Sequence, residues 1–320
     1  MPAKDDSFAA FDPLLAEADV SSSPWTGPNG RYEPHLPLLK AMLAIPISQG
    51  EAAKSQGGRT IKALDAWIAH ELRRAGFAPH EVWPRTRQPR VLPASLSDLE
   101  EQLETLAAAL TAHETEIGRS LRPVLLRRAI RALRESLPRG GAAHILGRFY
   151  AKQVDVVISS WQHGPELLVS TKSQFSSYNK NRNNRYEETI GEATNLRDRH
   201  PMAAMAYAFL VRSNIYEERG AFALLRDLLV RLRKPDGPYA ATMLLVADWS
   251  DALSLQSVSD ADEQLTASRF FDDLIGSALA NTPVQIHPEV RKRRGDDLRG
   301  GLPSSGEHAE PDPSAPQQPT

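Results

Sequence analysis

The chain has 320 residues, with 38 lysines and arginines against 40 aspartates and glutamates, a formal net charge of -2, and no cysteine. The lack of cysteine excludes disulfides, thiolate nucleophiles and cysteine-bound metal sites. No segment approaches the roughly 18 to 20 apolar residues of a membrane span. The first residues also lack the basic stretch and apolar run of a secretory signal. We therefore expect no membrane partner and a cytoplasmic location.

The first part of the chain, residues 1–140, is predicted to be a mostly helical region. After a segment rich in Pro, Gly and Ser with one short helix near 38–43, an amphipathic helix is predicted over 59–75, where apolar residues recur at steps of three and four. Further helices are predicted over 97–113 and 123–137. We expect this region to serve recognition or dimerisation.

The next part, residues 141–282, changes to short β-branched and apolar runs that alternate with helical patterns. Its predicted order is strand, strand, helix, strand, helix, strand, helix. The runs AYAFLV and MLLVA are typical of strands covered on both faces, which predicts a three-layer α/β sandwich around a mixed central sheet. The remaining residues, 283–320, are rich in Pro, Ser and charged residues, and we expect a disordered tail.

A predicted hairpin, VDVVISSWQHGPELLVSTKSQ, holds the most informative residues. Ser170 and Lys172 share one face of its second strand, since alternate strand residues point the same way. A lysine within such a strand is costly to bury without a partner, and Asp155 on the preceding strand is the nearest candidate. Taken singly, Asp155 is more simply interpreted as an ordinary polar strand residue, and Lys172 as a charge that protects an edge strand.

Asp155, a spacer and Ser170-Thr171-Lys172 together resemble the signature of the PD-(D/E)XK nucleases, a restriction-endonuclease-like superfamily. The sequence departs from that signature at two positions. Val154 stands where proline is expected before the aspartate, and Ser170 stands where an acid is expected two residues before the lysine. The resemblance covers about residues 147–250 and implies a restriction-endonuclease-like fold.

Some members of this superfamily supply the missing acid from the following helix, and the present sequence is similar to that variant. Glu187 and Glu188 lie at the matching distance after Lys172, and Glu192 is one turn further. We favour Glu188, because Glu187 can be occupied at a helix start formed with Asn184. On the alternative interpretation these glutamates form a solvated helix face.

The resemblance implies a Mg²⁺ ion held by Asp155 and by Glu188 or Glu187. It also implies that Lys172 positions the attacking water and that Ser170 is a secondary oxygen ligand. Four residues between the second strand and the helix are candidates for DNA contact through cations and amides, although a solvated loop is an equally simple interpretation: Lys180, Arg182, Asn184 and Arg185.

These expectations define a Mg²⁺-dependent DNA endonuclease, such as a type II restriction enzyme or a related nuclease of defence against phage. Its partners would be double-stranded DNA, a second copy of the chain in a homodimer, and a cognate methyltransferase or other defence component. The alternative is a nuclease-like module that has lost catalysis and acts in DNA binding or assembly. A third possibility is a helical interaction protein whose α/β part is a scaffold without affinity for nucleic acid.

Overall fold

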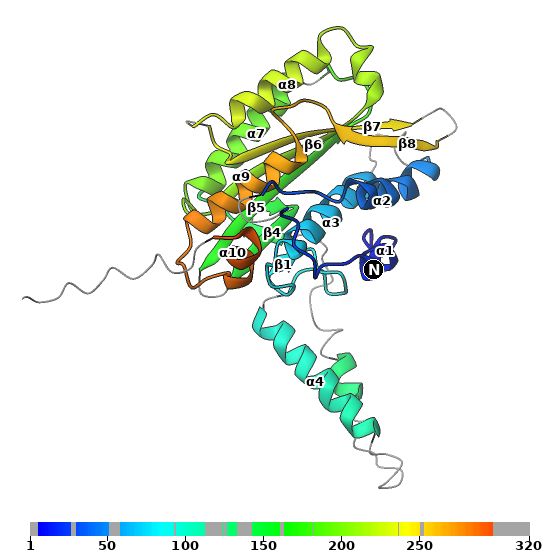
Figure 1. Cartoon of the computed structure of the whole chain (residues 1–320), viewed down its shortest axis with the longest axis vertical. Helices are drawn as coiled ribbons and strands as arrows, with labels where there is room; N and C mark the ends of the chain where they lie inside the picture. The colour runs from blue at the N-terminus through cyan, green and yellow to red at the C-terminus, as the bar shows by residue number, and fades with distance from the viewer. Residues whose placement is uncertain are drawn as a thin grey trace, which may run out of the picture.

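The structure is a computed structural model, and it describes residues 6–26, 30–50, 58–92, 94–112, 124, 127–132, 143–160, 163–180, 182–235, 237–249 and 253–296. Within these ranges the fold is α/β, with helices on both faces of a curled mixed sheet (Figure 1). None of the helices in these ranges has the length and apolar composition needed to cross a membrane.

The central sheet has six strands in the order β1-β4-β5-β6-β7-β8. The strands β5, β6 and β7 run parallel, and the neighbours on both sides are antiparallel. The bounds are β1 (Val82–Trp83), β4 (Val156–Ser160), β5 (Gly164–Gln174), β6 (Ala204–Arg212), β7 (Ala241–Trp249) and β8 (Leu255–Asp260). This arrangement confirms the predicted mixed sheet.

Helices cover each face because the parallel strands are joined by crossover connections. The helices α2 (Leu36–Ser48), α3 (Gly58–Arg74) and α9 (Ala267–Ala280) share a core with one face, and α7 (Arg182–Arg197) and α8 (Ala221–Leu232) share a core with the other. The shorter helices are α1 (Asp12–Glu17), the 3₁₀ helix η2 (Ser213–Tyr216) and α10 (Pro288–Arg294). The runs AYAFLV and MLLVA lie in β6 and β7 and are buried, as predicted.

The first strand of the predicted hairpin is divided at Asp155. Residues before it form β3 (Ala151–Val154), which pairs with β2 (Ala143–Leu146) in a separate two-stranded sheet. Residues after it form β4, which pairs with β5 as predicted. The strands β1 and β8 were not predicted, because the first is very short and the second is mostly exposed and polar.

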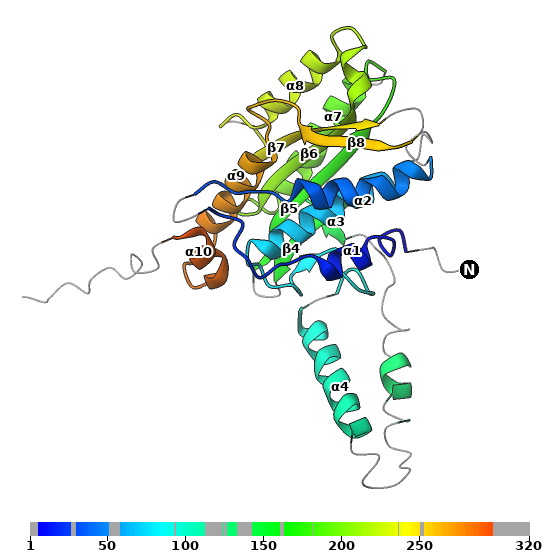
Figure 2. The ribbon, with the colours of Figure 1, turned by 45° about the vertical axis from the view of Figure 1, so that its right-hand side comes forward.

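The region expected to be a separate helical layer in residues 1–140 is in part a layer of the α/β unit. The helices α2 and α3 pack on β4, β5 and β8, and their buried side chains belong to the same core as the strands. The helix α4 (Ala94–Ala112) extends away from the sheet, as Figures 1 and 2 show. The predicted helix over 123–137 lies largely outside the described residues.

The C-terminal residues 283–320, which we expected to be disordered, contain the helix α10. The expected start of the disordered tail is therefore wrong. Val290 is fully buried in the core that α3 and α9 share. The Arg291 guanidinium donates hydrogen bonds to the backbone oxygens of Leu279, at 2.8 Å, and Thr282, at 3.1 Å. These contacts satisfy carbonyls at the end of α9. Residues 297–320 lie outside the described part.

The shared core predicts that α3 stabilises the whole unit. Trp67 is fully buried in α3, stands edge-on to Phe271 at 5.5 Å, and donates a hydrogen bond to the His35 carbonyl at 3.1 Å. We expect Trp67→Ala to lower the free energy of unfolding by about 3 to 5 kcal/mol. Denaturant unfolding measures this loss. Leu106→Ala, at a half-exposed site of α4, is the control and should change stability little; equal losses would contradict a shared core.

Candidate functional site

The last third of β5 carries polar side chains toward both helical layers of the molecule. Ser170 and Lys172 face α7, whereas Thr171 faces α3, as their contacts with Glu192, Glu188 and Asp65 show. Ser170 and Thr171 are buried. Because buried polar groups need partners, each side chain meets a charged group on the helix that covers it.

On the α7 side, two lysines and two glutamates form one network. Lys172 Nζ lies 3.6 Å from Glu188 Oε1, and Lys152 Nζ from β3 lies 2.8 Å from Glu192 Oε2 and 4.0 Å from Glu188 Oε1. The side chain of Glu188 is 54% exposed, while that of Glu192 is 3% exposed. The Ser170 hydroxyl donates a hydrogen bond to Glu192. Glu188 is therefore the carboxylate of this network that solvent and a substrate can reach.

On the α3 side, Thr171 joins two aspartates. Its backbone N–H donates to Asp155 Oδ2 at 3.0 Å, and its hydroxyl donates to Asp65 Oδ1. Lys62 of α3 closes the ring, with Nζ at 2.7 Å from Asp65 Oδ2 and 3.6 Å from Asp155 Oδ1. The break in the strand at Asp155 thus leaves its carboxylate between β5 and α3.

The charges of the α3 side influence one another strongly. Burial and the negative charge of Asp155 raise the pKa of Asp65 to about 6, and the positive charge of Lys62 limits this rise. For Lys62, burial alone would lower the pKa. The negative charges of Asp65 and Asp155 have the larger effect, so the pKa of Lys62 is raised. The pKa of Lys152 is likewise raised, since Glu192 and Glu188 outweigh its burial. The lysines therefore remain charged, whereas Asp65 titrates near neutral pH.

The predicted site residues are only partly brought together. Lys172 and Glu188 are in contact, and Asp155 is hydrogen-bonded to the residue next to Lys172. The side chain of Ser170 is engaged with Glu192. Among the residues that the structure describes, no group of three or more His, Asp or Glu side chains is placed to hold a metal ion.

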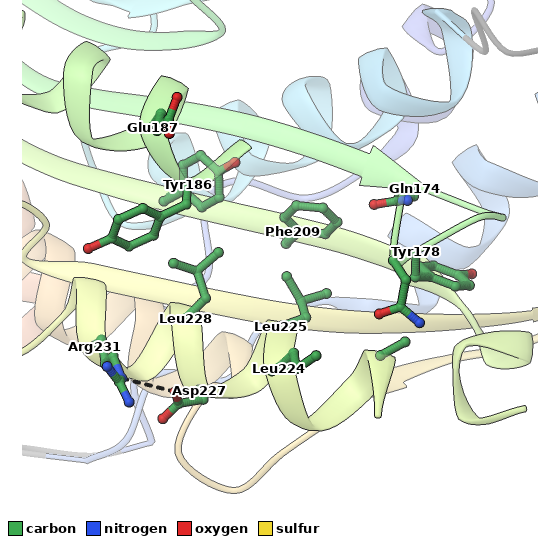
Figure 3. Close-up of a pocket in the computed structure, with 13 residues that line it drawn as sticks. Gln174, Tyr178, Tyr186, Glu187, Phe209, Leu224, Leu225, Asp227, Leu228 and Arg231 are labelled. Carbon is green, nitrogen blue, oxygen red and sulfur yellow. Dashed lines mark ion pairs between the residues drawn. The ribbon is translucent and has the colours of Figure 1, made fainter. Parts of the chain in front are cut away.

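Glu187, the other candidate ligand, lies apart from this network. It lines a cavity of about 390 Å³ between α7 and α8, whose floor includes Phe209, Leu225 and Leu228 (Figure 3). Gln174, two residues beyond Lys172, lines the same cavity. Adjacent helix residues point in different directions, which separates Glu187 from Glu188.

The predicted DNA-contacting residues lie at the start of α7. Lys180 is exposed in the turn before the helix. The helix begins at Arg182, two residues earlier than the expected start at Asn184. The side chains of Arg182, Asn184 and Arg185 lie outside the described part of the structure.

Three charged residues of the site were not predicted: Lys62, Asp65 and Lys152. Asp65 could have been found, because it follows Ile61 by four residues and precedes Ile68 by three, within the apolar stripe of its helix. An acid in such a stripe is costly to bury without partners and indicates a polar network. Lys152 lies in a short strand, and nothing in its pattern identifies it.

The pKa of Asp65 predicts a dependence of stability on pH. The folded state holds this proton more tightly than the unfolded state, whose aspartate has the ordinary pKa of 3.8. The resulting stabilisation is fully present below that value and is lost as pH rises through about 6. In unfolding measured from pH 4 to 7, Asp65→Asn should remove this component, whereas Asp227→Asn on exposed α8 should not. If the free energy of unfolding changes with pH in the same way for Asp65→Asn and wild type, the raised pKa of Asp65 is contradicted.

No protein-family model matches the chain, and no curated protein and no solved structure matches it.

Proposed function

We propose that the protein is a metal-dependent DNA endonuclease that resembles the PD-(D/E)XK superfamily and has a restriction-endonuclease-like fold. The observation that carries the proposal is the contact of Lys172 with Glu188, next to the hydrogen bond from Thr171 to Asp155. Asp155 immediately precedes β4, Thr171 and Lys172 lie in β5, which is antiparallel to β4, and Glu188 lies in the helix that follows. Lys62, Lys152 and Lys172 are ammonium groups that would contact a bound phosphate, although each is paired here with a carboxylate.

The cofactor we propose is Mg²⁺, with Asp155 and Glu188 as the residues that would hold it. Mg²⁺ in nucleases is commonly bound by one or two carboxylates, with waters and phosphate oxygens completing its shell. Both side chains supply hard oxygen donors, and each is paired with a lysine at 3.6 Å. The donor chemistry suits Mg²⁺, but Asp155 is held on the α3 side of β5 and Glu188 on the α7 side, and the described residues form no three-ligand cage.

Each residue would have a distinct task in phosphodiester hydrolysis. When bound, Mg²⁺ supplies positive charge that stabilises the phosphate oxygens and lowers the pKa of water. Lys172, 30% exposed at the end of β5, would orient the attacking water and balance the charge that develops on phosphate. Ser170 would act indirectly, because its hydrogen bond positions Glu192 beside Lys152.

The biological setting is part of the proposal. A type II restriction enzyme or a related phage-defence nuclease would act on double-stranded DNA in the cytoplasm, beside a cognate methyltransferase or another defence component. Cutting both strands calls for two active sites, which a homodimer supplies. Lys180 would bind phosphate at the start of α7, together with Arg182, Asn184 and Arg185.

A nuclease-like DNA-binding or assembly module without catalysis is the second candidate. It is favoured by ion pairs and hydrogen bonds that join each of four acids to a lysine or a hydroxyl, since such pairs can hold the fold together without a metal. The four acids are Asp65, Asp155, Glu188 and Glu192. Both candidates bind DNA, but only the endonuclease cleaves it.

Cleavage of mixed plasmid and phage DNA in Mg²⁺ tests the proposal. We expect Lys172→Ala to reduce the rate by about 100-fold or more, as for loss of a group that acts on the attacking water, while binding in Ca²⁺ is retained. Lys40→Ala, on the exposed side of α2, is the control and should cut normally. Cleavage retained by Lys172→Ala would overturn its role. DNA binding without cleavage by any variant, even in Mn²⁺, would favour the inactive module.

Adjacent glutamates offer a matched pair for the metal. We expect Glu188→Gln to abolish both cleavage and Mn²⁺ binding measured by calorimetry with DNA present, because it removes an accessible carboxylate. Glu187→Gln changes the same charge in the neighbouring cavity and should leave both intact. If Glu187→Gln abolishes cleavage and Mn²⁺ binding and Glu188→Gln does not, Glu187 is the metal ligand. If both variants have small and equal effects, neither glutamate binds the metal.

A further inference from the structure

The turn between β2 and β3 exposes large apolar side chains. Phe149 is 72% exposed, Leu146 52% and Tyr150 49%. The Arg148 side chain is 61% exposed, and its guanidinium lies 5.6 Å from the centre of the Phe149 ring. Single exposed apolar residues are common, but a cluster rimmed by charge marks an interaction site.

This turn is held firmly by one buried amide. Asn195 of α7, 1% exposed, accepts hydrogen bonds at Oδ1 from the backbone N–H groups of Phe149, at 2.9 Å, and Tyr150, at 3.3 Å. Its Nδ2 donates to the Tyr150 carbonyl at 3.1 Å, and its own carbonyl accepts from the Arg148 N–H at 2.8 Å. The turn therefore has its backbone groups satisfied and its shape fixed.

The packing beneath the turn is equally tight. A Cβ atom added at Gly147 would lie 2.2 Å from the side-chain nitrogen of Asn195, so the close approach requires glycine. His200 contacts the Leu146 carbonyl at 2.9 Å through its ring Nε2. A buried polar network thus holds Phe149 in solvent, where the ring gains no burial. This arrangement is expected of a preorganised contact residue rather than of a core residue.

The same network connects the turn to the candidate site. Glu188, Glu192 and Asn195 lie on one face of α7, and Lys152, two residues after Tyr150, contacts the two glutamates. Asn195 follows Glu188 by seven residues, which corresponds to roughly 10 Å along a helix.

We propose that residues 146–150 form a wedge that contacts DNA beside the cleaved phosphodiester. Phe149 stacks against or between bases, and Arg148 exchanges its contacts with Phe149 and Asp198 for a phosphate. This proposal rests on the proposed nuclease function and names DNA as the partner of a surface outside the catalytic residues.

The test compares DNA binding by full-length variants in Ca²⁺, followed by fluorescence anisotropy at several salt concentrations. We expect Phe149→Ala to weaken binding by roughly 5- to 150-fold, the range found for loss of base stacking, with an unchanged salt dependence. Arg148→Ala should weaken binding and lower the slope of log affinity against log salt by about one. Phe149→Trp should retain the affinity.

Tyr216→Ala is the matched control, since Tyr216 is 56% exposed in η2, and it should bind like the wild type. A duplex carrying 2-aminopurine should brighten with the wild type and with Phe149→Trp, and stay dim with Phe149→Ala, if bases are unstacked. Thermal melts of each variant establish that the fold is intact.

The outcomes separate the wedge from the nuclease. Normal cleavage and binding by Phe149→Ala would overturn the wedge and leave the nuclease standing. Binding that depends on Phe149 without any cleavage would support the wedge and reject catalysis. Absence of DNA binding by the wild type overturns the wedge, as does a change in oligomeric state caused by Phe149→Ala without DNA, because the surface would then join protein copies.

Discussion

The arrangement around β5 depends on one constraint: polar side chains at Ser170, Thr171 and Lys172 lie in a sheet covered on both faces. Such groups are unfavourable unless each has a partner. The partners come from α3 on one face and α7 on the other, so the strand fixes the position of both helices through charge as well as through packing. The break at Asp155 belongs to the same arrangement, because its carboxylate accepts a hydrogen bond from the Thr171 backbone.

Much of the fold was predictable from local pattern. The continuous apolar runs of β6 and β7, and the three- and four-residue spacing in α3, predicted type and position well, because a single physical period dominates each segment. The two-residue strand β1 and the exposed strand β8 carry little such signal. The helix α10 was missed, since its composition is that of a solvated segment while Val290 and Arg291 provide its attachment.

For the candidate site, only residues close together in the sequence could be predicted. Lys172 and Glu188 lie within a short stretch and are in contact, whereas Asp155 is hydrogen-bonded to Thr171 on the α3 side of β5. Lys62 and Asp65 enter from a helix about a hundred residues earlier, and no local period connects them to β5. Their presence also alters the chemistry. The acids of the site meet lysines, so a divalent cation would compete with ammonium groups for each carboxylate.

The contact between Asp65 and Thr171 spans 106 residues, and this separation affects how the chain folds during synthesis. The helix α3 leaves the ribosome long before the strands that cover its apolar face, at about 5 to 20 residues per second. The face of α3 that packs on the sheet therefore remains uncovered for roughly 5 to 20 seconds, until β5 follows, and Trp67 meets Phe271 of α9 later still. During this interval the exposed apolar side chains of α3 make the nascent chain prone to aggregation.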